Sequence, residues 1–319
     1  MRKTASAVPI RRVPMADESD TAALPFTGER FTPECVREIW YEHWHRYAFA
    51  LDLVRGKRVL DAACGEGYGS DLLAGSAAGV VGVDLSEAAI AHARERYGAR
   101  PNLQFAQGDA TRLPFDDARF DVVVSFETLE HLHEQERLIE GFARVLAADG
   151  LLIISSPDKR TYSDAMGFQN EFHVRELYRE ELLALLSSHF RSVRLYGQKL
   201  LFQSALWSLD RTPGGSQLWT AAQSADAAPS SGLDYAPIYY VAVCSRGDLP
   251  ADLPALSLFG DRDESVYAHY NHEVRKNMVA GARIAELEAE VARLRTQAAV
   301  PASSATREPP ARGWRRWLR

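Results

Sequence analysis

The chain has 319 residues, of which 46% are hydrophobic and 25% are charged, a composition typical of a globular protein with a full-sized core. The net charge of -6 argues against a nucleic-acid partner, and no apolar run reaches the roughly 18–20 residues that a membrane-spanning helix needs. The three cysteines are widely spaced and form no metal-type pair, which favours a reduced, cytoplasmic protein.

The predicted elements follow a leader, residues 1–25, that has charge but no apolar core and is expected to be disordered. Apolar and aromatic residues at helical spacing predict a first helix from Glu38 to Leu53. Five short apolar strands then alternate with helices, which implies a parallel sheet covered on both faces. Their sequences are RVLDAAC, GVVGVDLS, LQFAQGD, FDVVVSF and GLLIISSP.

Two later strand-like runs, FRSVRLYGQ and PIYYVAVCS, suit an antiparallel edge. The stretch between them, at about 205–235, is rich in Ser, Ala, Gly and Pro and is predicted to be a long mobile insertion. The globular domain is therefore expected to span 26–248. Three further segments are expected after it: a linker at 249–273, a coiled-coil helix at 274–299 and a disordered basic tail at 300–319.

The most specific motif is VLDAACGEGYG, which begins at Val59 on a predicted strand-turn-helix. Gly65 and Gly67 allow the backbone to approach a ligand closely. The dinucleotide pattern G-x-G-x-x-G is not met, because Ser70 stands where the third glycine belongs. Asp61 at the strand end would repel a pyrophosphate and attract a cation. S-adenosylmethionine (SAM) carries an ammonium and a sulfonium but no phosphate, so the charge favours SAM over a dinucleotide.

Two more acids close the next two strands. Asp84 ends the second strand, where a carboxylate can accept both ribose hydroxyls, and Asp109 follows the third strand, with Ala110 beside it, in position to meet the adenine amine. Each acid alone is equally well explained as a helix N-cap or a turn residue. Three acids at the carboxyl ends of successive strands together predict a SAM site.

From about Arg58 to Pro157 the chain resembles the class I SAM-dependent methyltransferases, with each motif in order. The resemblance implies a Rossmann-like, seven-stranded, mostly parallel sheet with an antiparallel edge strand and helices on both faces. It also implies cofactor contacts from Leu85 and Phe126. The sequence departs from the family at Ala63, where the family usually has the first glycine of the loop.

A wider pattern, over about Thr27–Gln198, resembles methyltransferases of bacterial surface-glycan and sugar pathways. The segments that carry this likeness are TGER at 27–30, EHWHRY at 42–47, SFETLEH at 125–131 and FHVRE at 172–176. By the same likeness, the helix that holds Arg46 would cap the cofactor, and Arg46 would meet the methionine carboxylate. The alternative is a surface arginine on an amphipathic helix.

Glu127, Glu130 and His131 follow the fourth strand directly, and on one helical turn their side chains would share a face. Two carboxylates and an imidazole suit Mg²⁺ or Mn²⁺. The spacing E-x-x-E-H resembles ubiquinone-pathway O-methyltransferases and small-RNA 3′-terminal methyltransferases, and the latter likeness implies that His173 completes the metal site. The alternative is a helix start near which His131, aided by Glu127, acts as a metal-free base.

Three functions fit these patterns. The first is a sugar or glycan O-methyltransferase, and the second is a methyltransferase of the same fold that acts on a quinone, a natural product or an RNA end. The acidic balance and the lack of a basic stripe weigh against RNA. The third is a non-catalytic scaffold that assembles through its coiled coil, but such a protein would be expected to have lost the SAM-binding acids.

The C-terminal helix carries apolar residues at alternating three- and four-residue spacing, which predicts a parallel homodimer. The seam consists of Ile284, Leu287, Val291, Leu294 and Ala298. The alternative is a single amphipathic helix packed on its own domain. The tail, REPPARGWRRWLR, suits contact with an anionic membrane surface, at the inner face of the membrane, or with a partner enzyme such as a glycosyltransferase.

Overall fold

The structure is a computed structural model, and it describes residues 38–167, 169–206, 209, 216–220 and 230–299. The predicted leader, the basic tail and much of the predicted insertion lie outside these residues. The chain divides into two compact units, Met1–Gly260 and Asp261–Arg319. Among the described residues, no helix is both long enough and apolar enough to cross a membrane.

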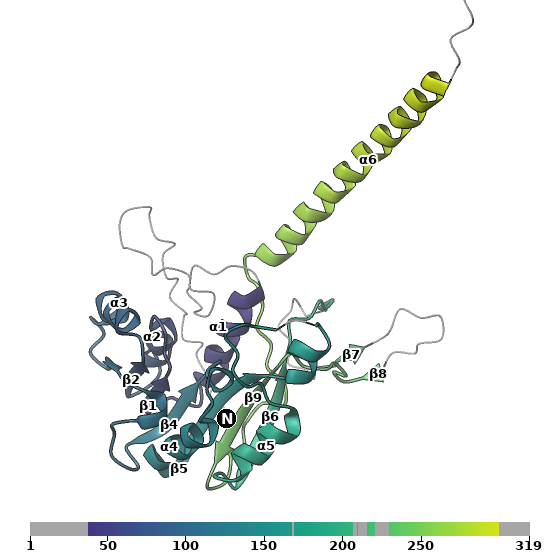
Figure 1. Cartoon of the computed structure of the whole chain (residues 1–319). Coiled ribbons are helices and arrows are strands. Elements are labelled where there is room, and N and C mark those ends of the chain that lie inside the picture. The colour runs from purple at the N-terminus through teal and green to yellow at the C-terminus, as the bar shows by residue number, and fades with distance from the viewer. Residues whose placement is uncertain (1–37, 168, 207–208, 210–215, 221–229, 300–319) are drawn as a thin grey trace, which may run out of the picture. The chain divides into compact units, whose positions relative to one another are not determined.

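Seven strands of the first unit form one sheet in the order β3-β2-β1-β4-β5-β9-β6 (Figure 1). The strands are β1 (Arg58–Ala62), β2 (Gly79–Asp84), β3 (Leu103–Gln107), β4 (Phe120–Ser125), β5 (Leu146–Pro157), β6 (Ser192–Gln198) and β9 (Tyr239–Ser245). The first five are parallel, and β9 runs antiparallel to both β5 and β6. The predicted Rossmann-like sheet is confirmed, with its antiparallel strand second from the edge.

Helices cover both faces of this sheet. They are α1 (Glu38–Ala50), α2 (Tyr68–Ala74), α3 (Glu87–Tyr97), α4 (Gln135–Val145) and α5 (Arg179–Ser187). Successive strand side chains point to opposite faces, so Val59 of β1 joins the core beneath α1, α2 and α3, whereas Leu60 joins the core beneath α4 and α5. Both side chains are fully buried, which explains why the strands read as continuous apolar runs.

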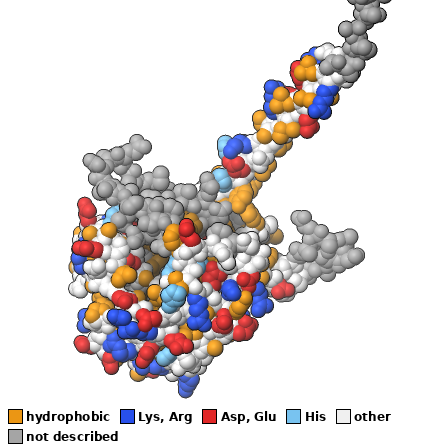
Figure 2. Space-filling view, viewed as in Figure 1, with side chains coloured by type: hydrophobic (Ala, Val, Ile, Leu, Met, Phe, Trp, Pro, Cys, Tyr) orange, Lys and Arg blue, Asp and Glu red, His pale blue; other side chains and the backbone are white. Residues whose placement is uncertain are grey.

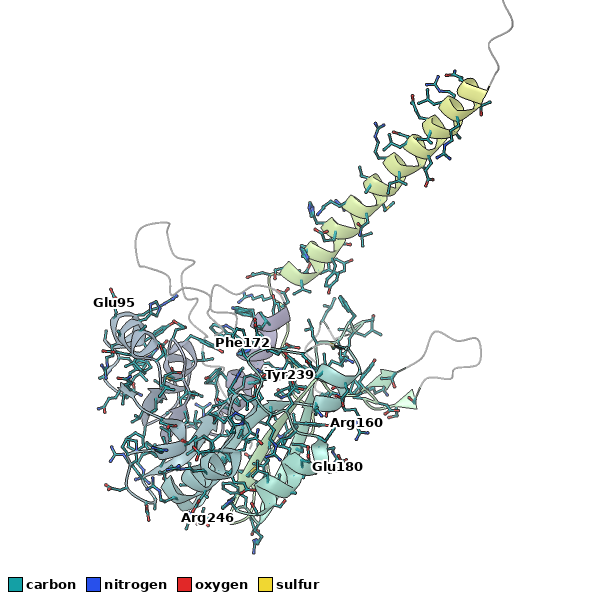
Figure 3. All side chains as sticks on the ribbon, in the orientation of Figure 1. Glu95, Arg160, Phe172, Glu180, Tyr239 and Arg246 are labelled. Atoms are coloured by element: carbon teal, nitrogen blue, oxygen red, sulfur yellow. The ribbon has the colours of Figure 1, made fainter. Side chains whose placement is uncertain are left out.

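The strand order reverses at β1, which lies between β2 and β4. Chain connections leave in opposite directions at this point, and open α/β sheets bind their ligands at the carboxyl ends of the strands beside such a reversal. In Figure 3, Phe172 and Tyr239 lie at this end of the sheet, and Arg246 lies at the opposite end. The residues that follow β1, β2, β3 and β4 therefore gather at one edge.

Two segments differ from the sequence prediction. Residues 249–260 were expected to be part of a linker, but they belong to the first unit. Leu253 is buried in its core and Phe259 packs against the same core, because burying these apolar side chains is favourable. Within the predicted insertion, Trp219–Thr220 (β7) and Ser230–Ser231 (β8) pair as a two-stranded ribbon.

The second unit contains α6 (Ser265–Ala299), which begins well before the predicted start near Val274. The Asp261 carboxylate sets this boundary, because Oδ2 accepts hydrogen bonds from the Val266 amide at 2.9 Å and from the Ser265 hydroxyl at 3.2 Å. A side-chain oxygen that accepts from the first free amides of a helix stabilises its start.

Candidate active site

The loop after β1 is tied to α1 and α2 through Asp61. This carboxylate is fully buried, and it accepts hydrogen bonds from the Ser70 hydroxyl at 2.6 Å and the Tyr47 hydroxyl at 3.3 Å. Burial raises the pKa of Asp61 to about 7, although the two hydrogen bonds oppose the rise. Ser70, which breaks the dinucleotide pattern, therefore orders the loop by holding Asp61.

The loop backbone turns through left-handed conformations at Ala63, Gly65 and Gly67, with φ of 59°, 58° and 94°. Ala63 thus adopts the geometry for which the family has a glycine. The next glycine is required for a different reason: a Cβ on Gly69 would lie 2.0 Å from the ring of Tyr47. The missing side chain lets α1 pack directly over the loop.

Asp84 lies beside this loop at the end of β2. Its Oδ2 accepts a hydrogen bond from the Gly65 amide and its Oδ1 accepts one from the Ser86 amide, each at 2.9 Å. Each carboxylate oxygen keeps a second lone pair, so the half-buried group can still accept from two ribose hydroxyls. The adjacent Leu85 is 71% exposed and offers an apolar surface at the same place.

Asp109 begins a short 3-10 turn, and its Oδ1 accepts from the Thr111 amide at 2.8 Å and the Thr111 hydroxyl at 2.7 Å. Partial burial opposes ionisation, but these hydrogen bonds outweigh it and hold the pKa of Asp109 below its ordinary value. The N-cap role and the predicted adenine contact are compatible, because Thr111 uses only one of the two oxygens. Ala110 follows within the turn and is partly exposed.

Arg46 projects from α1 and is 1% exposed, so the alternative of a surface arginine is wrong. Its Nε donates to Gln198 Oε1 at 2.7 Å, its Nη1 lies 3.4 Å from Glu127 Oε1, and its guanidinium stacks 4.5 Å from the ring centre of Tyr239. Among the described residues, Nη1 and Nη2 have no hydrogen-bond partner. The predicted contact with a methionine carboxylate stays a prediction, for which these two donors remain available.

Glu127 does not share a helical turn with Glu130 and His131, so this part of the prediction is wrong. Glu127 has a left-handed φ of 49°, and only Leu129–His131 form a 3-10 turn. Ser155 on β5 holds the strained residue, because its Oγ accepts from the Glu127 amide at 3.0 Å and donates to Glu127 Oε1 at 2.6 Å. The Glu127 side chain is therefore directed to Ser155 and Arg46.

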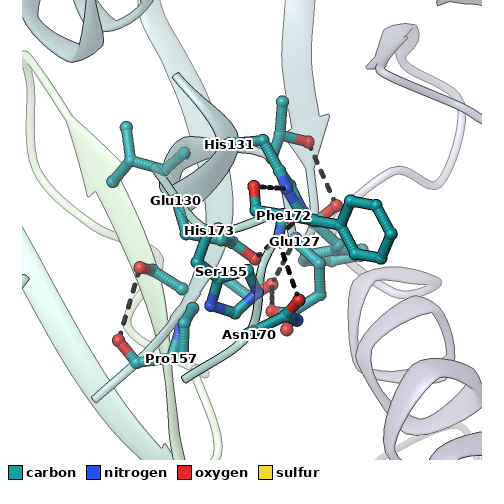
Figure 4. Close-up of polar contacts among 12 residues, drawn as sticks. Glu127, Glu130, His131, Ser155, Pro157, Asn170, Phe172 and His173 are labelled. Atoms are coloured by element: carbon teal, nitrogen blue, oxygen red, sulfur yellow. Dashed lines mark hydrogen bonds and ion pairs between the residues drawn. The ribbon is translucent and has the colours of Figure 1, made fainter. Parts of the chain in front are cut away.

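Glu130, His131 and His173 do come together (Figure 4), and each offers one ligand atom within 4.8 Å of the other two. Glu130 is 1% exposed, and within the described part of the chain neither carboxylate oxygen accepts a hydrogen bond. Burial, reinforced by the charge of Glu127, raises the pKa of Glu130 well above its ordinary value.

Both imidazoles are oriented by hydrogen bonds at Nδ1. His131 Nδ1 lies 3.0 Å from the Phe172 carbonyl oxygen, and His173 Nδ1 lies 2.6 Å from Glu176 Oε1. These oxygens can only accept, so Nδ1 carries the proton and the Nε2 lone pair of each ring is left for a ligand or a proton. Ser163 donates to Glu176 Oε2 at 2.6 Å and fixes the orienting carboxylate in turn.

Comparison with known proteins agrees with this geometry. Residues 60–154 match the family model of a methyltransferase domain. A probable SAM-dependent methyltransferase of Mycobacterium tuberculosis is 37% identical over 233 residues, which cover 70% of this chain and 83% of that protein. A probable SAM-dependent methyltransferase of Mycolicibacterium smegmatis is 37% identical over 66% of this chain and 81% of its own. The chain belongs to the SAM-dependent methyltransferases.

A demethylmenaquinone methyltransferase of Clavibacter sepedonicus is 39% identical to this methyltransferase over 105 residues, which cover 33% of the chain and 43% of that relative. Among solved structures, the YcgJ protein of Bacillus subtilis is 19% identical, with a TM-score of 0.46 over 65% of this chain and 100% of its own.

Several residues that shape the site of this methyltransferase were not identified from its sequence. Ser155 and Gln198 act on residues far away in the chain, so no local pattern marks them. Tyr47, which bonds Asp61, had a signal because it closes the EHWHRY segment. Glu176 had a signal, because it closes the FHVRE segment three residues after His173.

Phe126, a predicted cofactor contact, is buried and packs edge-on against Tyr47.

Proposed function

We propose that this methyltransferase transfers the SAM methyl group to a hydroxyl of a sugar or glycan, assisted by a divalent cation at Glu130, His131 and His173. The observation that carries the proposal is the Glu130 carboxylate, which is buried between two oriented imidazoles and accepts no hydrogen bond from the described residues.

The three side chains fit Mg²⁺ or Mn²⁺. A buried carboxylate without a hydrogen bond is costly, and a cation removes that cost. The donor set of one carboxylate oxygen and two imidazole nitrogens suits Mn²⁺ better than Mg²⁺, which prefers oxygen ligands. Glu176 and the Phe172 carbonyl support the two histidines from behind, as is usual around metal-bound imidazole.

Different groups would supply the methyl group, activate the acceptor hydroxyl and hold the cofactor. SAM supplies an electrophilic methyl group, and a bound cation lowers the pKa of an acceptor hydroxyl. Asp84 would hold the ribose of SAM and Asp109 its adenine amine, since each carboxylate keeps acceptor capacity beside the hydrogen bonds it already has within the protein. Methyl transfer is an in-line displacement in which the O–CH₃ bond forms as the S–CH₃ bond breaks, and the acidified hydroxyl releases its proton to solvent before the transfer. The rate depends on aligning the acceptor oxygen with the S–CH₃ bond.

A sugar acceptor is supported by two features. Neighbouring hydroxyls can bind one cation together, and a site with a buried carboxylate and two imidazoles offers such a cation a fixed position. The wider motif pattern, which includes Arg46 and Glu176, also resembles methyltransferases of glycan pathways. A metal-free alternative uses the same geometry, with His131 Nε2 accepting the hydroxyl proton.

The test is SAM-dependent methyl transfer to a panel of nucleotide sugars, alkyl glycosides, lipid-linked glycans and quinols, followed by mass spectrometry. We expect a single methylation on a sugar hydroxyl, loss of activity with EDTA, and recovery with Mn²⁺ or Mg²⁺. Full activity after exhaustive chelation would contradict the cation and leave His131 as a plain base. Methylation of quinols alone would contradict the sugar acceptor.

A further inference from the structure

A cavity lies next to the proposed active site. Its volume is about 440 Å³, within the usual size range of small-molecule sites, and it adjoins the carboxyl end of β6. One face of α1 forms a wall, together with residues 199–201, 203 and 255–259. Arg46 lines the cavity and also contacts Glu127, so the cavity and the catalytic edge of the sheet share one side chain.

Four polar side chains of the lining are hydrogen-bonded within the protein. Gln198 bonds Arg46 and the Glu42 carbonyl, Tyr196 bonds the Pro254 carbonyl, Lys199 bonds the Ala236 carbonyl, and His45 bonds Ser257. A sugar chain needs free donors and acceptors at its binding site. These four side chains are already engaged, and most of the other lining residues, such as Phe49, Leu200 and Val241, are apolar, so the surface that remains for a ligand is mainly apolar.

The same cavity has exposed apolar side chains along its lining. Leu258 is 69% exposed, and Leu233, Tyr235 and Leu256 are also exposed although they belong to one lining. Isolated exposed leucines are ordinary, but a group of them around one hollow indicates a binding surface. An aliphatic ligand would cover these side chains and fill the hollow.

We propose that this cavity binds the apolar chain of the acceptor, so that the methylated hydroxyl belongs to a head group carried on an acyl or prenyl chain. The inference rests on the proposed function, whose substrate class it narrows to a lipid-linked hydroxyl compound. Arg46 marks the boundary, with the chain on the β6 side and the head group on the side of Glu127.

The test is calorimetric binding of methyl, hexyl, octyl and decyl glucosides, each below its micelle concentration. We expect affinity to rise roughly fourfold for each added CH₂ until the cavity is filled. Leu258→Asp should abolish this dependence on chain length, because it places a charge in the lining. Met166→Asp is the matched control, since Met166 is also exposed but lies outside the cavity lining.

Affinity that does not depend on chain length, or a Leu258→Asp variant that binds like the unmodified protein, would overturn the inference. The binding measurement does not depend on methyl transfer. The proposed cavity and the proposed function can therefore be contradicted independently of each other. Chain-length-dependent binding without methyl transfer to any sugar contradicts only the proposed function. Efficient methylation of short-chain sugars with no effect of chain length contradicts only the cavity.

An independent observation concerns α6. The side chains of Ile284, Leu287, Val291 and Leu294 follow a heptad pattern and are about half exposed. Hydrophobic side chains, coloured orange, lie along this helix in Figure 2. β-branched residues at the first core position and leucines at the second favour a parallel, two-stranded coiled coil. Such a row of apolar side chains is stabilised when another helix covers it.

We also infer that the partner is α6 of a second copy of this chain. In a parallel pair, Arg283 would face Glu288 of the second copy, and Glu290 would face Arg295 of the second copy. Both pairs are of opposite charge, and symmetry forms each of them twice. The sequence of the helix is therefore complementary to itself in this one register.

Light scattering on the full chain tests the dimer. Arg283→Glu opposes two carboxylates across the pair, and we expect it to weaken dimerisation by at least about tenfold. The double variant Arg283→Glu with Glu288→Arg restores opposite charges and should restore the dimer. A monomeric full-length protein, or a dimer that Arg283→Glu leaves unchanged, would overturn the inference.

Discussion

Replacing Asp84 by alanine should weaken SAM binding by at least about a hundredfold. Its carboxylate has two lone pairs left for ribose hydroxyls, and each hydrogen bond to a charged group contributes about 1.5–3 kcal/mol. The same substitution frees the Gly65 amide, which loosens the loop. Titration calorimetry gives the dissociation constants of the two proteins directly.

Two controls accompany that measurement. Asp84→Asn keeps the volume and one acceptor oxygen, so its affinity should lie between those of the other two proteins. Asp116→Ala removes an exposed carboxylate that follows the 3-10 turn after β3, and it should bind SAM normally. Unchanged affinity in Asp84→Ala would remove Asp84 from the cofactor site.

Replacing Glu130 by glutamine should abolish cation binding and lower turnover by at least about a hundredfold, since it removes the charged ligand. The same variant should be more stable than the unmodified protein in EDTA. The raised pKa of Glu130 means that the folded state holds its proton more tightly than the unfolded state. Stability therefore falls as the pH rises from about 4 towards the folded-state pKa, and glutamine is free of this loss.

Thermal unfolding across the pH range, with EDTA and with Mn²⁺, measures both effects. The difference between Glu130→Gln and the unmodified protein should grow as the pH rises in EDTA, and Mn²⁺ should stabilise only the unmodified protein. Glu176→Gln is the matched variant, because it disturbs His173 without removing a ligand, and we expect it to weaken cation binding about 10- to 100-fold. If Mn²⁺ stabilises Glu130→Gln as much as it stabilises the unmodified protein, Glu130 is not a ligand.

The sequence predicts the sheet well because buried parallel strands have an unmistakable pattern. Val59 and Leu60 are both fully buried, on opposite faces, so the strand has no polar alternation and two helical layers must cover it. The acids at the strand ends follow from the same topology, since carboxyl ends of parallel strands meet at one edge. Asp84 and Asp109 lie where this reasoning puts them.

The details of the acceptor side could not be predicted, because they depend on single backbone angles and on distant partners. Periodicity assumes a helix at Glu127, but its left-handed φ interrupts the helical course, and its side chain contacts Ser155 and Arg46. Ser155 and Gln198, which hold Glu127 and Arg46, are 28 and 152 residues away in the chain. The burial of Arg46 likewise comes from packing rather than from its neighbours in sequence.

The position of α1 has a thermodynamic consequence. Tyr47 ties this helix to the cofactor loop through Asp61, while the adjacent Arg46 contacts Glu127 and lines the β6 cavity. Binding of either ligand immobilises α1, which costs conformational entropy. The other ligand then binds to a helix that is already ordered, so its own binding costs less conformational entropy. Cofactor and acceptor should then bind with positive cooperativity, and linkage makes the factor identical in both directions.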